Sequence, residues 1–344
     1  MPPKTPVTAQ KTLPEFKKPE HVRGVYLTAW SVGSTNKLDH MIDFIGRTEI
    51  NSFVIDVRDD GNNYWKNEIA LSKEVGANTT AVVKPTAVIE KLSKAGVYPI
   101  ARIACFRDRF VPAKYPDRAV RLAATGGVWK DASKHTWLDP YCKANWDYLG
   151  SIVDYALDLG FPEIQLDYVR FPSEGKASTM GFPSKKKYLK KDAKPAEVVA
   201  AFAQFIADRV HKRKAIISAD VFGVISVNTS DQGIGQELEV VAKPFDLICP
   251  MVYPSHFYAG MYNIKNPNAA PFDIVYKSLK DYAKRLPGKT IRPWLQDFSL
   301  GVKYGKAEVQ AQIKAARSVG YQEYLLWNAR NIYTEAAVAK APVK

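Results

Sequence analysis

Short apolar runs alternate with longer amphipathic stretches from residue 22 onward, and this alternation predicts the fold. Eight runs are rich in β-branched and aromatic residues and are bounded by Gly, Pro or charged residues, which is typical of strands. They lie at residues 22–30, 50–59, 97–106, 163–171, 215–223, 246–253, 290–298 and 323–328. Segments with apolar residues at three- and four-residue spacing, which predicts helices, lie at residues 39–48, 86–95, 143–159, 196–211, 274–285 and 307–316.

Eight strands alternating with helices predict an α/β protein whose parallel sheet closes into a (β/α)8 TIM barrel. The connections agree with this, because helix-to-strand turns are short and marked by glycine, whereas the strand-to-helix connections at 107–142 and 172–195 are long. Barrel enzymes carry their active sites on the face where the strands end. An open doubly wound sheet is the alternative, but no GxGxxG or Walker motif favours it. We therefore expect a single barrel domain over residues 22–340.

The composition is that of an ordinary soluble globular protein, with 46% hydrophobic and 24% charged residues among 344. It excludes a collagen-like repeat and a disulfide scaffold, and no stretch approaches the ~18 apolar residues of a membrane span. Residues 1–21 are rich in Pro and Lys and predict a disordered tether without the apolar segment of a signal peptide. Such a segment can follow a removed export signal or anchor, or it can be the plain tail of a cytoplasmic protein.

The cysteines and histidines show no metal-binding spacing. Cys105, Cys142 and Cys249 are widely separated and form no CxxC motif, which argues against a zinc site and a disulfide framework. Cys105 and Cys249 stand in apolar runs, so we expect them to be small buried hydrophobes. His135 and His256 are isolated, no HExxH or HxxxH spacing occurs, and we interpret both as ordinary loop residues. We expect no metal and no cofactor.

Two acidic residues near the ends of neighbouring predicted strands are the candidate catalytic pair. The alternation of side chains along a strand places Gln165 and Asp167 inside the barrel on the fourth strand, and Ser218 and Asp220 inside on the fifth. Neighbouring strands lie about 4.8 Å apart, so the two carboxylates can meet across a small cleft. Glycoside hydrolysis needs one carboxylate as nucleophile or base and a second group as acid. We predict that Asp167 and Asp220 fill these roles.

Other polar and aromatic residues at the same strand ends are candidate substrate-binding residues. Aromatic rings offer apolar platforms for sugars, and inward arginines would hold Asp167 in its charged form. The candidates are Trp30, Asp56, Arg58, Arg102, Tyr168, Arg170, Tyr253, Trp294, Gln296, Asp297, Trp327 and Asn328. We expect Asp56, Arg58 and Asp60 to share one face by the two-residue period of a strand. Taken singly, each candidate also suits packing, capping or internal charge neutralisation.

Four segments resemble a bacterial family of glycosyl-hydrolase-like proteins catalogued as domain of unknown function 4015. They lie at residues 106–120, 126–141, 159–175 and 324–334, and the box Asp-Tyr-Val-Arg-Phe-Pro that begins at Asp167 is specific. The resemblance covers about residues 22–334. It implies a TIM-barrel glycosidase-like protein, usually exported or at the cell envelope, and leaves the substrate open.

The chain is also similar, more distantly, to the α-amylase-like barrels. In those proteins a nucleophilic Asp ends the fourth strand and a third acid ends the seventh, which match Asp167 and Asp297. The acid on their fifth strand is Glu, where this chain has Asp220, and their arginine two residues before the nucleophile is Gln165 here. The shorter Asp side chain permits a wider, inverting geometry. Glu174 is the alternative acid, and retention and inversion both stay open.

The positive charge is concentrated in one segment. The chain has 49 Lys and Arg against 35 Asp and Glu, a net charge of +14, and residues 176–194 contain seven Lys against one Asp. We favour a solvated, mobile loop over attraction to a polyanion such as an acidic polysaccharide, teichoic acid or nucleic acid. Nucleic acid is the least expected, because no RRM, OB or helix-turn-helix pattern accompanies the segment.

The sequence therefore predicts a monomeric glycoside hydrolase without metal or cofactor. Its expected substrate is a poly- or oligosaccharide, with an acidic or cell-envelope glycan as the candidate. The expected location is outside the cell or in the envelope, with the cytoplasm as the alternative. A non-catalytic carbohydrate-binding barrel at the cell envelope is the second hypothesis for the function.

Overall fold

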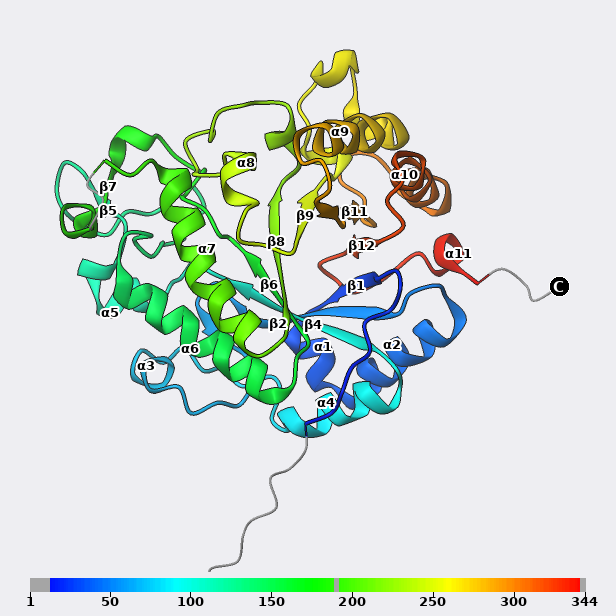
Figure 1. The fold of residues 1–344 in the computed structure, drawn as a ribbon, viewed down its shortest axis with the longest axis horizontal. Helices are drawn as coiled ribbons and strands as arrows, with labels where there is room; N and C mark the ends of the chain where they lie inside the picture. Colours follow the sequence, from blue (N-terminus) through cyan, green and yellow to red (C-terminus); the bar gives the residue numbers. More distant parts are fainter. Residues whose placement is uncertain (1–12, 189–191, 341–344) are drawn as a thin grey trace, which may run out of the picture.

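The computed structural model describes residues 13–188 and 192–340. Eight parallel strands form a closed barrel surrounded by helices (Figure 1): β1 (Arg23–Leu27), β2 (Ser52–Asp59), β4 (Tyr98–Ala104), β6 (Glu163–Asp167), β8 (Ile216–Phe222), β9 (Leu247–Met251), β11 (Trp294–Gln296) and β12 (Tyr324–Trp327). Each strand pairs with the next, and β1 closes the barrel by pairing with both β2 and β12. The short β10 (Thr290–Ile291) precedes β11 and pairs with β9. The predicted (β/α)8 barrel and its eight strands are confirmed.

The helices that cover the barrel also follow the predicted pattern. The six longest described ones are α2 (Thr35–Arg47), α4 (Pro85–Lys94), α6 (Lys143–Leu159), α7 (Pro195–Lys212), α9 (Pro271–Arg285) and α10 (Lys306–Val319), and each overlaps a predicted helix. Gly160 ends α6 with a φ of 97°, a left-handed conformation that glycine adopts without strain. The shorter elements are α1 (Ala29–Gly33), α3 (Ala70–Glu74), α5 (Val111–Lys114), α8 (Leu238–Val241), α11 (Glu335–Val338) and β3 (Asn62–Asn63).

Side chains alternate between the barrel interior and the helical layer, as the strand period requires. The interior contains an apolar cluster that includes Val54, Ile100, Cys249 and Trp294, while a larger cluster lies between the strands and the helices. Cys105 and Cys249 are buried and free, which confirms their predicted role as small hydrophobes. The barrel interior is therefore a packed core, and it becomes polar at the carboxyl ends of the strands.

Two long strand-to-helix loops fold onto each other at one side of the barrel. Within them, β5 (Arg121–Leu122) pairs antiparallel with β7 (Met180–Gly181), at the left edge of Figure 1. The described part of the lysine-rich segment, which the sequence predicts to be a loop, contains the 3-10 turns Ala177–Thr179 and Pro183–Lys187. Residues 189–191 lie outside the described residues.

The described part of the amino-terminal segment lies along the barrel. Phe16 packs against both apolar clusters, and Lys18 forms an ion pair of 2.9 Å with Glu323 at the start of the eighth strand. Residues 13–21, part of the tether predicted for residues 1–21, therefore include a side chain that packs on the barrel, namely Phe16. The first twelve residues lie outside the described part of the chain. Across residues 13–188 and 192–340, no helix combines the length and the apolar character needed to span a membrane.

Candidate active site

A pocket of about 450 Å³ opens at the carboxyl ends of the barrel strands. Its volume is in the range of small-ligand sites. The side chains that line it come from several strands and the loops that follow them. They are Arg102, Asp167, Tyr168, Arg170, Glu174, Asp220, Phe222, Gly223, Val224, Met251, Tyr253, His256, Phe257, Trp294 and Trp327. The pocket therefore combines an apolar, aromatic wall with a small number of charged groups.

Asp167 ends β6 and is held by donors on both carboxylate oxygens. Arg102 on β4 donates to Oδ2 from Nε at 3.1 Å and from Nη2 at 2.6 Å. The backbone N–H of Tyr168 donates to Oδ1 at 2.6 Å, and Tyr168 has a φ of 49°, which turns the chain directly after the strand. These bonds fix the orientation of the carboxylate.

Asp220 on β8 lies in a contrasting environment. It is buried, and the indole Nε1 of Trp294 donates to its Oδ1 at 2.6 Å. Burial, together with the nearby charge of Asp167, raises the pKa of Asp220 well above its usual value. No described residue hydrogen-bonds to Oδ2 of Asp220, so this oxygen can carry the proton. The pocket thus contains one ion-paired carboxylate and one carboxyl group that is biased toward its protonated form.

Arg102 connects Asp167 to a buried chain of polar groups. Its Nη1 donates to Asp56 Oδ1 at 2.5 Å, and the hydroxyl of Tyr26 donates to Asp56 Oδ2 at 2.5 Å. Tyr26 in turn stacks on Trp327 with ring centroids 4.0 Å apart. Burial raises the pKa of Asp56 to about 6, although Arg102 acts in the opposite direction. The orientation of Asp167 therefore depends on residues that lie behind the pocket wall.

Glu174, the alternative acid, is held as a carboxylate by Arg170. Burial alone would raise the pKa of Glu174, but the charge of Arg170 and its 3.0 Å hydrogen bond bring that pKa below its usual value. The guanidinium of Arg170 packs over the rings of Trp137 and Phe222 at 4.8 and 4.6 Å. A general acid must carry a proton before it reacts. The environment of Glu174 therefore suits this role less well than the environment of Asp220 does.

Six of the twelve predicted binding residues line the pocket, namely Arg102, Tyr168, Arg170, Tyr253, Trp294 and Trp327. Asp56 lies behind Arg102. Trp30 is 55% exposed and packs edge-on against Tyr64, outside the pocket lining. Both residues contribute to the same end of the barrel without facing the pocket.

Arg58 points away from Asp56, contrary to the shared face expected from the strand period. The pairing of β2 with β4 shifts register between Asp56 and Arg58, which reverses the side-chain alternation. The Arg58 guanidinium is fully buried outside the barrel, where it pairs with Asp108 and lies 5.8 Å from the ring of Tyr148 on α6. Asp60 has a φ of 45°, so it too leaves the regular strand.

Gln296, Asp297 and Asn328 connect loops instead of lining the pocket. Thr334 donates to both carboxylate oxygens of Asp297, from its backbone N–H at 2.8 Å and its hydroxyl at 2.6 Å. Asn328 donates to the carbonyl oxygens of Asp297 and Ile332, and Gln296 accepts from the backbone N–H of Ser255. Asp297 is therefore hydrogen-bonded to the loop after the eighth strand and does not line the pocket. The sequence comparison matches it to the third acid of the α-amylase-like barrels.

Several residues of the pocket wall were not predicted, above all His256. Its Nδ1 lies 3.0 Å from the hydroxyl of Ser255, and burial lowers its pKa, which keeps the ring neutral. Its position directly after the sixth strand was the available signal. Gly223 also lies at the wall, where a Cβ atom would lie 2.6 Å from the carbonyl oxygen of Met251. In the described parts of the chain, no three His, Cys, Asp or Glu side chains gather as metal ligands.

Solved structures with a similar fold are glycosidases and related barrels. A hypothetical protein from Ruminiclostridium thermocellum is 34% identical over 57% of this chain and 97% of its own, with a TM-score of 0.51. The α-galactosidase of Thermus thermophilus, in complex with stachyose, has a TM-score of 0.56 at 11% identity and covers 94% of this chain and 65% of its own. The spore cortex-lytic enzyme SleL of Bacillus megaterium has a TM-score of 0.52 at 10% identity, covering 93% and 74%. At such low identity, the last two show the fold alone.

The family assignment comes from the sequence itself. None of the curated proteins matches the chain. In contrast, a family model with the description "Putative glycosyl hydrolase domain" matches residues 24–333, which span the whole barrel. The chain therefore belongs to the glycosyl-hydrolase family catalogued as domain of unknown function 4015.

Proposed function

We propose that this protein hydrolyses glycosidic bonds with Asp167 and Asp220 as the reacting carboxyl groups. The observation that supports this most directly is that the two carboxyl groups lie in one pocket but in different electrostatic environments. Asp167 is ion-paired with Arg102, whereas burial raises the pKa of Asp220. Pairs of carboxyl groups whose environments differ in this way divide the acid and base roles of glycosidases.

In the proposed reaction, Asp220 donates its proton to the glycosidic oxygen as the bond between that oxygen and the anomeric carbon breaks. As that bond breaks, Asp167 either attacks the anomeric carbon or takes a proton from the water that attacks it. In the first case a glycosyl-enzyme forms, and water then cleaves its bond to Asp167 while Asp220, now deprotonated, takes up a proton from that water. The aromatic rings of Trp294, Trp327 and Tyr253 line the pocket and offer apolar faces to the sugar. The configuration of the released sugar, followed by NMR, distinguishes retention from inversion.

The test begins with a screen of the purified protein against bacterial wall and capsular glycans. On any glycan that is cleaved, we expect Asp167→Asn and Asp220→Asn each to lower kcat by roughly 10²–10⁴-fold. Glu174→Gln is the matched control, and it should lose less, because Arg170 holds Glu174 as a carboxylate. Full activity of both Asp variants would overturn the assignment. A large loss in Glu174→Gln with none in Asp220→Asn would transfer the acid role to Glu174.

One observation favours a second candidate function, carbohydrate binding without turnover. Both oxygens of Asp167 already accept hydrogen bonds, two of them from Arg102. A carboxylate held so firmly is a weaker nucleophile or base, because its charge is shared with a guanidinium. Binding of a glycan with no cleavage product, in wild type and in Asp220→Asn alike, would favour this alternative.

We propose a poly- or oligosaccharide substrate, and acidic glycans of the cell envelope are the first class to test. The support is the +14 net charge of the chain together with the family resemblance, which implies an exported or envelope protein. We also propose that the protein acts as a monomer outside the cytoplasm. Cell fractionation and the elution volume of the purified protein test these two points, and a dimer or a purely cytoplasmic protein would contradict them.

A further inference from the structure

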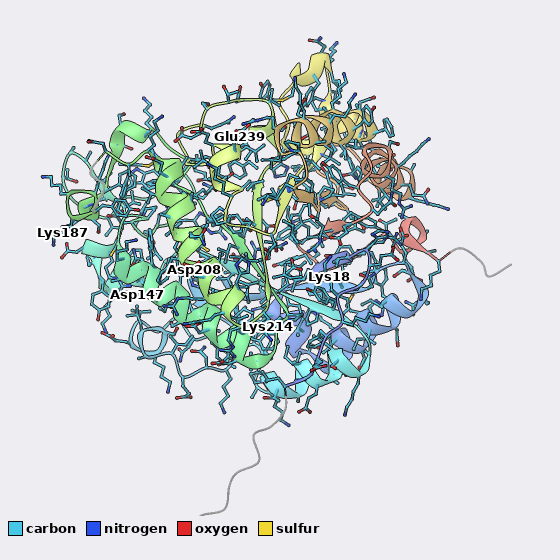
Figure 2. All side chains as sticks on the ribbon, viewed as in Figure 1. Lys18, Asp147, Lys187, Asp208, Lys214 and Glu239 are labelled. Atoms are coloured by element: carbon cyan, nitrogen blue, oxygen red, sulfur yellow. The ribbon has the colours of Figure 1, made fainter. Side chains whose placement is uncertain are left out.

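More than half of the net positive charge lies in two segments of the sequence, whose described parts fold together beside the pocket. Residues 107–142 contain seven Lys and Arg against four Asp, and residues 172–194 contain seven Lys against one Glu and one Asp, so these loops contribute +8 of the +14. Figure 2 labels Lys187 at the outer edge of this region. We call the described residues of these two segments the basic loop pair.

The basic loop pair is a folded unit, because its two members bond to each other. Trp129 donates from Nε1 to Thr179 Oγ1 at 3.0 Å, and the backbone N–H of Ser184 donates to Asp139 Oδ2 at 2.8 Å. Phe182 packs against the rings of Tyr141 and Phe171, with centroids 5.7 and 5.2 Å apart. A surface that is already ordered loses less conformational entropy when it binds a ligand than a mobile loop would.

Three lysines come together where the two loops touch. Trp129 lies so close to Gly175 that a Cβ there would be 2.6 Å from its ring, and the Ala132 backbone N–H donates to the Glu174 carbonyl at 3.3 Å. Lys130, Lys134 and Lys176 therefore stand on adjoining backbone, and all three are exposed. Three further exposed lysines, 185 to 187, follow in the 3-10 turn of the same unit.

These lysines have no acidic partners within the described residues. None of the ion pairs that join described side chains involves Lys130, Lys134, Lys176 or the lysines at 185–187. By contrast, two other cations of the same loops are paired, since Lys114 contacts Glu74 at 3.2 Å and Arg121 contacts Asp117 at 2.9 Å. A group of exposed cations without counter-charges attracts polyanions over roughly a Debye length.

The position and chemistry of this surface favour a carbohydrate polymer as its ligand. Glu174 lines the pocket and is bonded through its carbonyl to Ala132, so the lysines begin at the pocket rim. Binding of single-stranded nucleic acid relies on exposed aromatic rings for base stacking. Of the exposed large apolar side chains among the described residues, only Leu122 belongs to the basic loop pair, and it is not aromatic. Lysines alone suit carboxylates or phosphates on sugars.

We propose that Lys130, Lys134, Lys176 and Lys185–Lys187 form a binding surface for an acidic carbohydrate polymer, which passes from this surface into the pocket. The support for binding is the exposed lysines of the basic loop pair, which have no ion pair with described residues. Only the link between this binding and turnover rests on the proposed function. The surface would hold a polymer that carries uronate or phosphodiester groups while one of its sugars occupies the pocket.

The test measures binding in the Asp220→Asn background, so that cleavage does not interfere. The probes are polygalacturonate, a phosphodiester-linked teichoic acid, neutral dextran and single-stranded DNA, each at low and at physiological salt. We compare K130Q/K134Q/K176Q and K185Q/K186Q/K187Q with the control K212Q/K243Q/K314Q. The control also removes three exposed lysines, which lie on α7, after α8 and on α10 and have no ion pair with described residues.

We expect at least one acidic glycan to bind more tightly than dextran and DNA, with an affinity that falls as salt rises. At least one of the two loop variants should weaken this binding about tenfold, while the control variant does not. The proposal is overturned by binding that is independent of salt, by equal losses in the loop and control variants, or by tightest binding to DNA. Cleavage of a neutral glycan by the wild type, with no binding of acidic polymers, would overturn this proposal and leave the proposed hydrolysis intact.

Discussion

Two clusters of buried charge lie at opposite ends of the barrel interior, and they differ in how their charges are balanced. At the amino end of the strands, Arg292 donates to Glu163 at 2.7 Å and to Glu323 at 2.8 Å, and Lys18 pairs with Glu323 at 2.9 Å. Tyr98 and Ser218 also donate hydrogen bonds to Glu163. Two acids thus face two bases, and Phe16 covers this end of the core.

At the carboxyl end, acids outnumber bases. Asp56 and Asp167 share Arg102, and Asp220 receives only the indole N–H of Trp294. Burial raises the pKa values of Asp56 and Asp220, so these two groups take up protons at higher pH than ordinary carboxyl groups do. We therefore expect the balanced cluster to serve stability and, under the proposed function, the unbalanced cluster to supply the proton for catalysis.

The largest effect is expected at the balanced end. Arg292→Met leaves Glu163 and Glu323 without their central partner, and we expect it to lower the free energy of unfolding by about 3–5 kcal/mol. The activity of the folded fraction should be unchanged, because Arg292 does not line the pocket. Denaturant unfolding and initial rates measure the two quantities. Arg47→Gln, which breaks the exposed pair with Glu335, is the control and should lower the free energy of unfolding far less, because solvent screens this pair. A loss as small as that of the control would contradict the comparison.

Arg102→Met should lower activity more than stability, the reverse of the result expected for Arg292→Met. Asp56 and Asp167 lose their shared cation, but Asp56, whose pKa burial raises to about 6, can take up a proton, so the loss of stability should be smaller than in Arg292→Met. Turnover should fall by roughly 10²-fold, since Asp167 loses the two N–H donors that orient it. The pH optimum should also shift, which a purely structural role would not produce. Arg102→Lys, which retains the charge, should recover part of the activity. Equal effects of Arg102→Met and Arg292→Met on both measurements would remove the distinction between the ends.

The sequence predicts the barrel well because its strands and helices are local patterns with clear periods. α6 begins and ends where its apolar spacing predicts, and the eight strands all fall inside predicted runs. Asp167 and Asp220 share a pocket because both stand at inward positions near the ends of adjacent strands, which the two-residue period specifies. These features depend on neighbours along the chain and are therefore visible without the structure.

Other features depend on contacts between distant segments, and the sequence does not show them. The register shift in β2 turns Arg58 out of the barrel, and the residue between Asp56 and Arg58 does not predict this shift. The partner of Asp297 is Thr334, thirty-seven residues later in the chain. Likewise, Trp129 and Asp139 of another loop form hydrogen bonds with Thr179 and Ser184 in the described part of the lysine-rich segment. Turns and loops that are ordered by long-range contacts are therefore the part that sequence patterns miss.

The two ends should respond to pH in opposite directions. The folded state raises the pKa of Asp56 to about 6, so it binds this proton more tightly than the unfolded chain does, and stability falls as pH rises from about 4 to 6. The effect is at most about 3 kcal/mol. Arg292 and Lys18 lower the pKa of Glu323 despite its burial, so its contribution is lost as pH falls below the unfolded value. Unfolding free energies measured from about pH 3 to pH 7 should lose the decrease with rising pH in Asp56→Asn and the decrease at acidic pH in Glu323→Gln. Unchanged slopes in both variants would contradict this assignment.

The smallest effect is expected from the segment that covers the balanced end. Phe16 is half-buried against both apolar clusters, so Phe16→Ala should lower the free energy of unfolding by about 1 kcal/mol. Leu13→Ala, at a side chain that is 47% exposed, is the matched control and should cost less. Activity should remain unchanged in both variants, because the pocket lies at the other end of the barrel. A loss of activity in Phe16→Ala with unchanged stability would mean that the two ends are coupled, and the separation of stability from chemistry would then fail.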